Sequence, residues 1–232
     1  MNQIESLTRT FETVAKKNGY RSKDVSMQVN KLIDKSVKGL GTTVVEEAPN
    51  GSLISYDVYT RLLKDRVLFF GHQVMDEVTN IAVAQLLFLE MIDDKKDITM
   101  YLNSPGGSTG AGKSLIDVME YITPDVSVVN IGMCASMGAV ILACGTKGKR
   151  YALKSAKTMI HEVSTGMEGK SSSIAVSFEQ MMKEEESLYT ILAEKSGQTF
   201  EVIKEKCKMD YWMNPTEAKE FGLIDEVLLK RK

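Results

Sequence analysis

The sequence is poor in the residues that build metal sites and disulfide frameworks. It has three cysteines, Cys134, Cys144 and Cys207, and only two histidines among 232 residues. The cysteines lack the spacing of metal ligands, and an odd number of thiols cannot all form disulfides. We therefore expect reduced thiols, no metal site and no cofactor.

A strong net charge and a long apolar run are also absent. The formal net charge is −2, which indicates neither a nucleic-acid partner nor an acidic membrane surface. No apolar segment reaches the ~18 residues that a membrane-spanning helix needs. The first residues, MNQIESLTRTFETVAKK, have no apolar signal core and contain Glu5 and Glu12. We therefore expect a cytoplasmic protein that acts on neither nucleic acid nor membrane.

One segment, GMCASMGAVILACG, places Ser136 where an apolar strand turns into an apolar helix. Free backbone N–H groups and the positive end of the helix dipole would lie beside a serine at this point. Such groups could hold the oxyanion that forms when a serine attacks an acyl carbon. The position equally suits an ordinary helix-capping serine, so the segment alone leaves both interpretations open.

A serine hydrolase also needs a base and an acid that orients it. The candidate bases are His72, in a predicted turn, and His161, which follows the apolar run TMI. Either one could instead be a structural histidine. Downstream candidates for the acid include Glu162, Asp210 and Asp225, and spacing alone does not choose among them.

A competing motif runs from Gly107 to Ser114. Its residues, GSTGAGKS, match the phosphate-binding pattern G-x-x-x-x-G-K-[ST] between a strand-like and a helix-like run. Two observations weaken the match. Ser104 and Pro105 separate the strand from the glycines, and no later strand ends in an acidic residue that would hold magnesium. Nucleotide binding through Lys113 is therefore kept only as an alternative.

Several motifs, in order, resemble the ClpP family of serine peptidases, the proteolytic subunits of Clp proteases. They are YLNSPGGSTGAG, GMCASMGAVILACGTKGKRYAL, MIHE and MDYWMNPTEAKEFGLIDEV, with SYDVYTRLLKDRVLFFG and NIAVAQLLFLEMIDD matching the family's N-terminal part. The resemblance runs from about Thr42 to the C-terminus. It implies an α/β fold of the ClpP/crotonase type, with repeated ββα or βαβ units, a mainly parallel sheet and a protruding handle helix. GSTGAGKS is then an accidental match, because SPGG is the family's own turn.

The family's functional residues fall on matching positions of this chain. The resemblance implies that Ser136 is the nucleophile, His161 the base and Asp210 the acid. It places the oxyanion donors at the backbone N–H groups of Gly107 and Met137. The reaction would be peptide hydrolysis through an acyl-enzyme on the serine.

The resemblance also implies partners. It predicts a self-compartmentalising homo-oligomer, in which heptameric rings stack in pairs into a tetradecamer and enclose the active sites. A separate AAA+ unfoldase of the ClpX, ClpA or ClpC kind would consume ATP and supply unfolded polypeptide. Tyr101, in MYLN, matches an aromatic residue of the family's unfoldase-docking pocket, although it could equally be a strand-end core tyrosine.

Some positions depart from the family pattern. Glu162 and Val163 follow His161 where Gln-Pro is usual, and Met209 and Ser173 stand where the family has the two halves of a ring-to-ring ion pair. Because of these changes, a non-catalytic structural subunit of a Clp-type barrel stays an alternative interpretation. A further alternative is an acyl-CoA enzyme of crotonase fold, which the presence of a full serine–histidine–aspartate set disfavours.

The pattern divides the chain near Thr42. Residues 1–41 are expected to be an N-terminal extension or propeptide, helical or disordered, and residues 42–232 a ClpP-like serine peptidase domain. This domain is expected to open with a hairpin, VVEEAPNGSL, that turns at Asn50-Gly51. Alternating segments then indicate βαβ units: helices at 55–64, 79–91, 110–122, 137–144, 172–195, 200–207 and 215–221, and strands at 67–69, 98–102, 126–130, 150–152 and 158–160.

Overall fold

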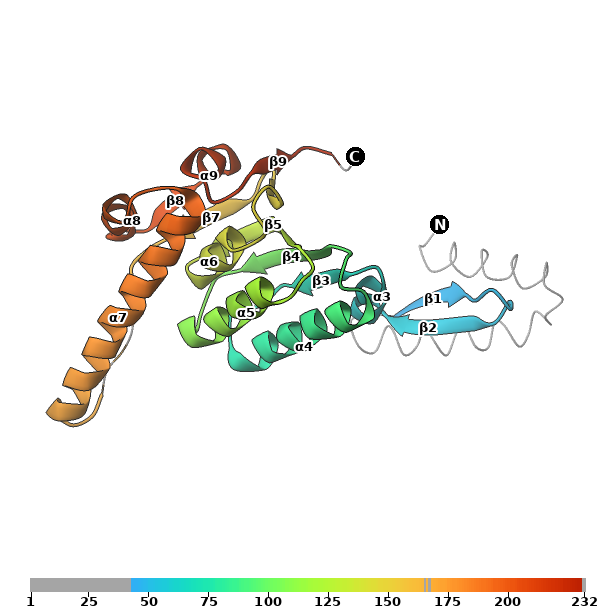
Figure 1. The fold of residues 1–232 in the computed structure, drawn as a ribbon, viewed down its shortest axis with the longest axis horizontal. Coiled ribbons are helices and arrows are strands. Elements are labelled where there is room, and N and C mark those ends of the chain that lie inside the picture. Colours follow the sequence, from blue (N-terminus) through green and yellow to red (C-terminus); the bar gives the residue numbers. More distant parts are fainter. Residues whose placement is uncertain (1–42, 165, 167, 231–232) are drawn as a thin grey trace, which may run out of the picture. The chain divides into compact units, whose positions relative to one another are not determined.

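The computed structural model describes residues 43–164, 166 and 168–230, so the expected extension over residues 1–41 lies outside the described part. The chain divides into two compact units at the boundary between Asp65 and Arg66. Figure 1 labels the helices and strands of both units, which are described separately. Among the described residues, no helix combines the length and the apolar character that crossing a membrane requires.

The first unit contains the predicted hairpin. Strand β1 (Thr43–Glu47) pairs antiparallel with β2 (Leu53–Asp57). The turn lies one residue earlier than predicted, because the Gly51 N–H donates to the Ala48 carbonyl at 2.8 Å. Pro49 and Asn50 are thus the central residues, and Gly51 follows with a φ of +78°. Proline favours the first central position of such a turn because its own φ is fixed.

Helix α3 (Val58–Lys64) follows β2 directly. The helix was predicted over 55–64, and the observed helix starts three residues later because β2 continues to Asp57. The Asp57 carboxylate then caps the helix by accepting hydrogen bonds from the N–H groups of Tyr59 and Thr60.

A mainly parallel sheet forms the centre of the second unit, as predicted. Its strand order is β3-β4-β5-β6-β9, with β7 pairing with β5 and β8 pairing with β7. Every pairing in this sheet is parallel except β7–β8. Side chains of β4 alternate between buried and less buried, whereas the first half of β5 is buried throughout, as expected of a central parallel strand. The strands are β3 (Val67–Phe70), β4 (Ile98–Ser104), β5 (Val126–Ala135), β6 (Arg150–Leu153), β7 (Lys157–Ile160), β8 (Tyr211–Met213) and β9 (Glu226–Leu228).

Helices α4, α5 and α6 follow one another along one face of this sheet (Figure 1). All seven residues of α6 are buried, so this helix belongs to the core. Helix α7 is long, projects away from the sheet, and buries side chains only near its C-terminal end. It corresponds to the predicted protruding helix. The helices are α4 (Asp76–Ile92), α5 (Thr109–Tyr121), α6 (Met137–Ala143), α7 (Ser171–Ser196), α8 (Phe200–Cys207) and α9 (Pro215–Phe221).

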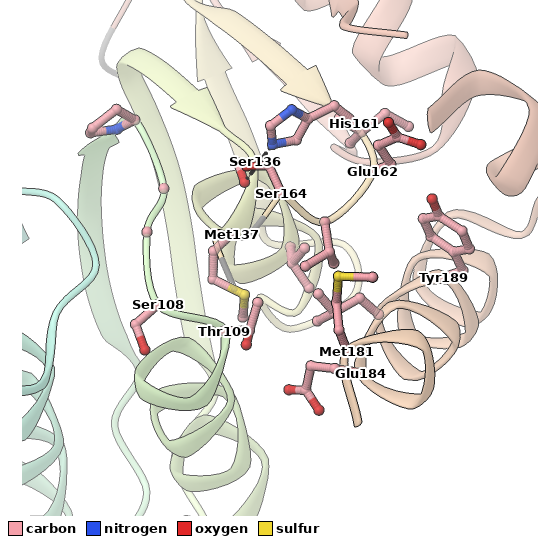
Figure 2. Close-up of a pocket in the computed structure, with 18 of the residues that line it drawn as sticks. Ser108, Thr109, Ser136, Met137, His161, Glu162, Ser164, Met181, Glu184 and Tyr189 are labelled. Atoms are coloured by element: carbon pink, nitrogen blue, oxygen red, sulfur yellow. Dashed lines mark hydrogen bonds between the residues drawn. The ribbon is translucent and has the colours of Figure 1, made fainter. Parts of the chain in front are cut away.

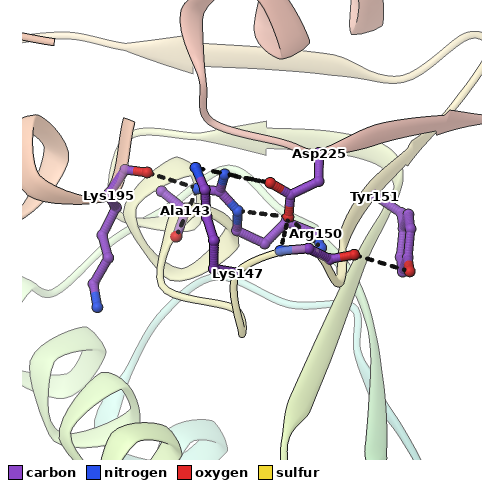
Figure 3. A network of polar contacts seen from close by, with 7 residues as sticks. Ala143, Lys147, Arg150, Tyr151, Lys195 and Asp225 are labelled. Carbon is purple, nitrogen blue, oxygen red and sulfur yellow. Dashed lines mark hydrogen bonds and ion pairs between the residues drawn. The ribbon is translucent and has the colours of Figure 1, made fainter. Parts of the chain in front are cut away.

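A buried arginine joins the ends of several elements (Figure 3). The Arg150 side chain is 1% exposed and donates to both carboxylate oxygens of Asp225, at 2.9 and 2.7 Å. Its guanidinium also donates to the carbonyls of Ala143, near the end of α6, and Lys195, near the end of α7. Burial alone raises the pKa of the Asp225 carboxyl, but hydrogen bonds from Arg150 outweigh it and the pKa is lowered.

Candidate active site

Ser136 lies between β5 and α6 in an unusual backbone conformation. Its φ of +54° and ψ of −126° are rarely adopted by residues other than glycine. Two backbone hydrogen bonds hold it there: its N–H donates to the Met159 carbonyl at 2.8 Å, and its carbonyl accepts from the Ala139 N–H at 2.9 Å. This strained turn presents the Ser136 hydroxyl at the end of the central strand.

The loop before α5 passes directly against this turn. A Cβ atom on Gly106 would lie 2.6 Å from the Ala135 carbonyl oxygen and 2.7 Å from the Ser136 Cβ. Gly138 packs as closely from the other side, because a Cβ there would lie 2.8 Å from the Ser104 carbonyl oxygen. Glycine is therefore required at both positions for the loop and the serine turn to meet.

His161 follows the last residue of β7 and reaches the serine. Its Nε2 lies 2.8 Å from the Ser136 Oγ (Figure 2). The parallel pairing of β5 and β7 explains this contact. Ala135 is paired with Met159, and Ser136 and His161 follow these two residues at the same ends of the two strands. The other sequence candidate for the base, His72, lies in an exposed bend between β3 and α4.

Asp210 immediately precedes β8. Because β8 runs antiparallel to β7 and pairs Tyr211 with Ile160, Asp210 stands beside His161. Its Oδ1 lies 3.3 Å from the His161 Nδ1. A carboxylate accepts hydrogen bonds, so in a neutral ring Nδ1 carries the proton and Nε2 accepts from the serine hydroxyl. The Asp210 side chain is 61% exposed, against 25% for His161.

The two other candidate acids are placed differently. Asp225 is bound by Arg150, as described above. Glu162 follows His161 with an exposed side chain, and its backbone N–H donates to the Cys207 carbonyl at 2.7 Å. The structure thus brings Ser136, His161 and Asp210 together, whereas Asp225 pairs with Arg150 and the Glu162 side chain is exposed.

The backbone N–H groups of Met137 and Gly107 are the oxyanion donors that the family resemblance implies. That of Met137 is the first in α6 and has no partner within its own helix. Gly107 lies in an extended segment whose neighbours bind Val74: the Gly106 carbonyl accepts from the Val74 N–H, and the Ser108 N–H donates to the Val74 carbonyl. The Gly107 N–H therefore faces away from Val74, and this glycine lines the same cleft as Ser136.

A cleft of about 970 Å³ adjoins these groups. Its walls are the loop before α5 with the first residues of that helix, the segment after β7, and the inner side of α7. In Figure 2 Ser108 and Thr109 lie across the cleft from Met181 and Glu184 of α7. Ser136 and His161 both line this cleft.

The GSTGAGKS segment does not form a phosphate-binding loop. Helix α5 already begins at Thr109, and the Ser108 hydroxyl caps it by accepting from the Ala111 N–H at 3.3 Å. A phosphate loop needs non-helical residues before its lysine, so that several N–H groups converge on the ligand. Here Lys113 lies within the helix and forms an ion pair with Glu184 at 3.0 Å. The nucleotide-binding alternative therefore lacks its geometry.

All three cysteines are buried and free. Cys134, two residues before Ser136, is completely buried, and burial raises the pKa of its thiol. Burial likewise raises the pKa of Cys144 and Cys207 to about 12. A thiol is nucleophilic only as the thiolate, so the three buried cysteines pack in the core, whereas Ser136 lines the cleft.

Tyr101 lies in β4, paired with Phe69 of β3. The tyrosine is partly exposed and Phe69 is 40% exposed. Tyr101 therefore lies on the sheet face opposite the buried Met100 and Leu102, and it is not a core residue. This position leaves it accessible to a partner.

A hydroxyl, an imidazole and a carboxylate lie in this order at the ends of paired strands, which is the arrangement that serine hydrolases use. The family model for Clp protease matches residues 50–231. The chain belongs to the Clp protease family, and its α/β fold with a mainly parallel sheet is that of a ClpP-type peptidase. Membership of this family also implies a self-assembled proteolytic complex.

The local sequence does not distinguish the residues of α7 that line the cleft. Glu184 binds Lys113, and Glu185 accepts a hydrogen bond from the Val163 N–H at 3.1 Å. In the sequence these glutamates form part of KEEES, a run typical of a solvated helix surface. Only the tertiary packing shows that Glu184 lines the cleft and that Glu185 binds the segment after His161.

Proposed function

We propose that the protein is a serine endopeptidase that uses Ser136 as nucleophile, His161 as general base and Asp210 as the acid that orients the base. One observation carries the proposal: the imidazole contacts the serine Oγ at 2.8 Å through Nε2 and the carboxylate at 3.3 Å through Nδ1. Each ring nitrogen thus has the partner that the reaction requires.

The reaction follows from this geometry. His161 takes the hydroxyl proton as Ser136 attacks the peptide carbonyl, and the resulting oxyanion accepts hydrogen bonds from the N–H groups of Gly107 and Met137. The imidazolium, stabilised by Asp210, then protonates the leaving amine. Water, activated by the same imidazole, releases the acyl group from the serine.

The proposal includes the setting of the reaction. The subunits form heptameric rings that stack in pairs in the cytoplasm. The stacked rings enclose the active sites, so that folded proteins cannot reach the unselective serine nucleophile. A AAA+ unfoldase of the ClpX, ClpA or ClpC kind supplies unfolded polypeptide and consumes the ATP. The family match supports self-assembly, and the helical GSTGAGKS segment supports a separate ATPase.

The test compares Ser136→Ala with Ser172→Ala in the assembled protein. Ser136→Ala removes the nucleophile and should lower hydrolysis of a fluorogenic peptide at least ~10³-fold. Ser172→Ala removes the hydroxyl of an exposed residue in the first turn of α7 and should leave the rate unchanged. A fluorophosphonate probe should modify the wild type at Ser136 and leave Ser136→Ala unmodified.

A different result would favour the alternative of a structural subunit. If the assembled wild-type protein neither hydrolyses peptides nor reacts with the probe, the proposed function is wrong. A decrease of only a few fold in Ser136→Ala would also contradict the assignment of the nucleophile.

A further inference from the structure

Two adjacent glutamates of α7 bind opposite walls of the cleft. The Glu184 Oε2 lies 3.0 Å from the Lys113 Nζ of α5, and both side chains are about two-thirds or more buried (26% and 32% exposed for the lysine and the glutamate). The Glu185 Oε2 accepts a hydrogen bond from the backbone N–H of Val163 at 3.1 Å. One turn of α7 is therefore connected both to α5 and to the segment that follows His161.

The segment after His161 is held from two sides. On one side Glu185 binds the Val163 N–H. On the other side the Glu162 N–H donates to the carbonyl of Cys207, the last residue of α8, at 2.7 Å. Cys207 lies only three residues before Asp210. The contact to α8 thus connects the base to the chain that carries its acid, and the contact to Glu185 connects it to α7.

The acceptor of the Val163 hydrogen bond is a carboxyl oxygen of Glu185, close to a buried tyrosine. A hydrogen bond from a backbone N–H to a carboxylate is stronger than one between neutral groups. Tyr189, one turn later in α7, is 4% exposed. Burial, followed by the charge of Glu185, raises the pKa of this tyrosine, so its hydroxyl keeps its proton beside the carboxylate.

We propose that Glu185 is a positioning residue for peptide hydrolysis, which holds the residue-161–163 segment so that the His161 imidazole stays aimed at Ser136. The Lys113–Glu184 ion pair holds the same turn of α7 against α5. It therefore fixes the position of the neighbouring Glu185 backbone. Lys113, in the motif that does not bind nucleotide, thereby takes part in the site as a support. The inference rests on the proposed function of Ser136 and His161.

The test measures kcat and KM for a fluorogenic peptide in Glu185→Ala, Glu185→Gln and Glu186→Ala. An error of about 1 Å in the placement of a catalytic group can cost ~10²-fold in rate, so Glu185→Ala should lower kcat at least ~10-fold and change KM by less than about threefold. Glu185→Gln keeps an oxygen that can accept from Val163 and should recover most of the rate. Glu186→Ala makes the same truncation at the next, exposed residue and should match the wild type.

The pH dependence separates positioning from a merely structural role. Loss of the alignment between His161 and Asp210 removes stabilisation of the imidazolium, so the acidic limb of the kcat/KM profile should move to lower pH in Glu185→Ala. A variant that only destabilises the fold would lose active protein without moving this limb. Assembly size and thermal unfolding are measured for each variant, and Glu185→Leu, which keeps the side-chain bulk but accepts no hydrogen bond from Val163, provides the same test if Glu185→Ala does not assemble.

The support from α5 is tested with Lys113→Met alone and combined with Glu185→Ala. Because both residues act through one turn of α7, the combined decrease in kcat should be smaller than the product of the single decreases. The inference is wrong if Ser136 is required for activity while Glu185→Ala behaves as Glu186→Ala does. If Ser136→Ala retains activity, the proposed function fails instead, so the two failures are distinguishable.

Discussion

The backbone of Ser136 has a conformation that a serine adopts only when its neighbours hold it there. A φ of +54° at such a residue costs about 1–3 kcal/mol. The hydrogen bonds to Met159 and Ala139 and the close approach of Gly106 offset this cost. The position of the reactive hydroxyl therefore depends on residues that take no part in the proton transfers.

Gly106→Ala tests this dependence. The added Cβ would lie 2.6 Å from the Ala135 carbonyl oxygen and 2.9 Å from the Met137 N, at a φ of +91°. We expect the rate of fluorophosphonate labelling at Ser136 to fall at least ~10-fold, because the loop that carries the Gly107 N–H must shift.

Gly110→Ala, in α5 of the same segment, is the matched control for Gly106→Ala. The nearest atom to its Cβ would be the Ser108 Oγ at 4.0 Å, and alanine favours a helix by up to about 1 kcal/mol over glycine. Labelling of this variant at the wild-type rate is expected. Equal labelling of both variants would show that Gly106 does not shape the site.

At the residue scale, the sequence was informative about the serine and less so about the acid. The apolar strand, the small residues and the apolar helix around Ser136 are local features, and the structure shows the strand-to-helix turn there. The choice among Glu162, Asp210 and Asp225 depends on which strands pair, and a local pattern does not contain that information. The family resemblance favoured Asp210, which is the acid that lies beside His161.

At the element scale, the pairing of β7 with β8 is what brings the acid to the base. β8 and β9 have three residues each, and neither was predicted, because segments this short show no periodic pattern of apolar and polar residues. β5 extends to Ala135 instead of ending at Asn130, since it gains a second partner in β7 beyond the bulge at Leu102–Ser104. The bounds of α8 and α9 agree with the prediction because capping residues, such as Asn214 before α9, mark them in the sequence.

The ion pair of Arg150 with Asp225 should contribute strongly to the stability of the ends of α6 and α7. Asp225→Asn leaves a buried guanidinium without its counter-charge, which typically costs about 3–5 kcal/mol. We expect a loss of this size in the free energy of unfolding, measured by urea denaturation at neutral pH. Glu205→Gln, which breaks the exposed pair with Lys208, should cost less than about 1 kcal/mol.

The Arg150–Asp225 ion pair should also make the free energy of unfolding depend on pH, and the direction of this dependence follows from the pKa of Asp225. The pKa of Asp225 is lowered in the folded protein from its ordinary value of 3.8. Its contribution is therefore present above pH 3.8 and is lost as the pH falls through the lower, folded-state pKa. The stability difference between the wild type and Asp225→Asn should shrink in that acidic range. A constant difference there would contradict the assignment.

At the scale of the whole molecule, Tyr101 is the residue through which the proposed binding of a partner can be tested. It lies in β4 with Phe69 beside it on β3, and it does not line the cleft of Ser136. If this aromatic pair is the docking point for a AAA+ unfoldase, Tyr101→Ala should hydrolyse small peptides normally. It should lose most of the ATP-dependent degradation of a folded substrate with a ClpX-type partner.

Tyr121→Ala removes a tyrosine that is 79% exposed at the end of α5, and it serves as the matched control for Tyr101→Ala. Both activities should persist in this variant. Unchanged ATP-dependent degradation by Tyr101→Ala would show that the unfoldase binds elsewhere.

The family, the fold class and the mainly parallel sheet of the whole molecule were predictable, because they rest on motifs spread over most of the chain. The division near Thr42 stays a prediction, since residues 1–41 lie outside the described part. The assembly and the proposed binding of an unfoldase involve several chains, and a single sequence constrains them only through the surfaces it offers.

The burial of all three cysteines has a practical consequence for work in solution. Thiol-directed dyes and spin labels react with exposed thiolates, so the natural protein should give almost no background in such reactions. A single cysteine introduced at Met209, which is 79% exposed and adjoins Asp210, would carry a reporter to the edge of the site. Movements of that edge could then be followed by fluorescence or by electron paramagnetic resonance without first replacing any native cysteine.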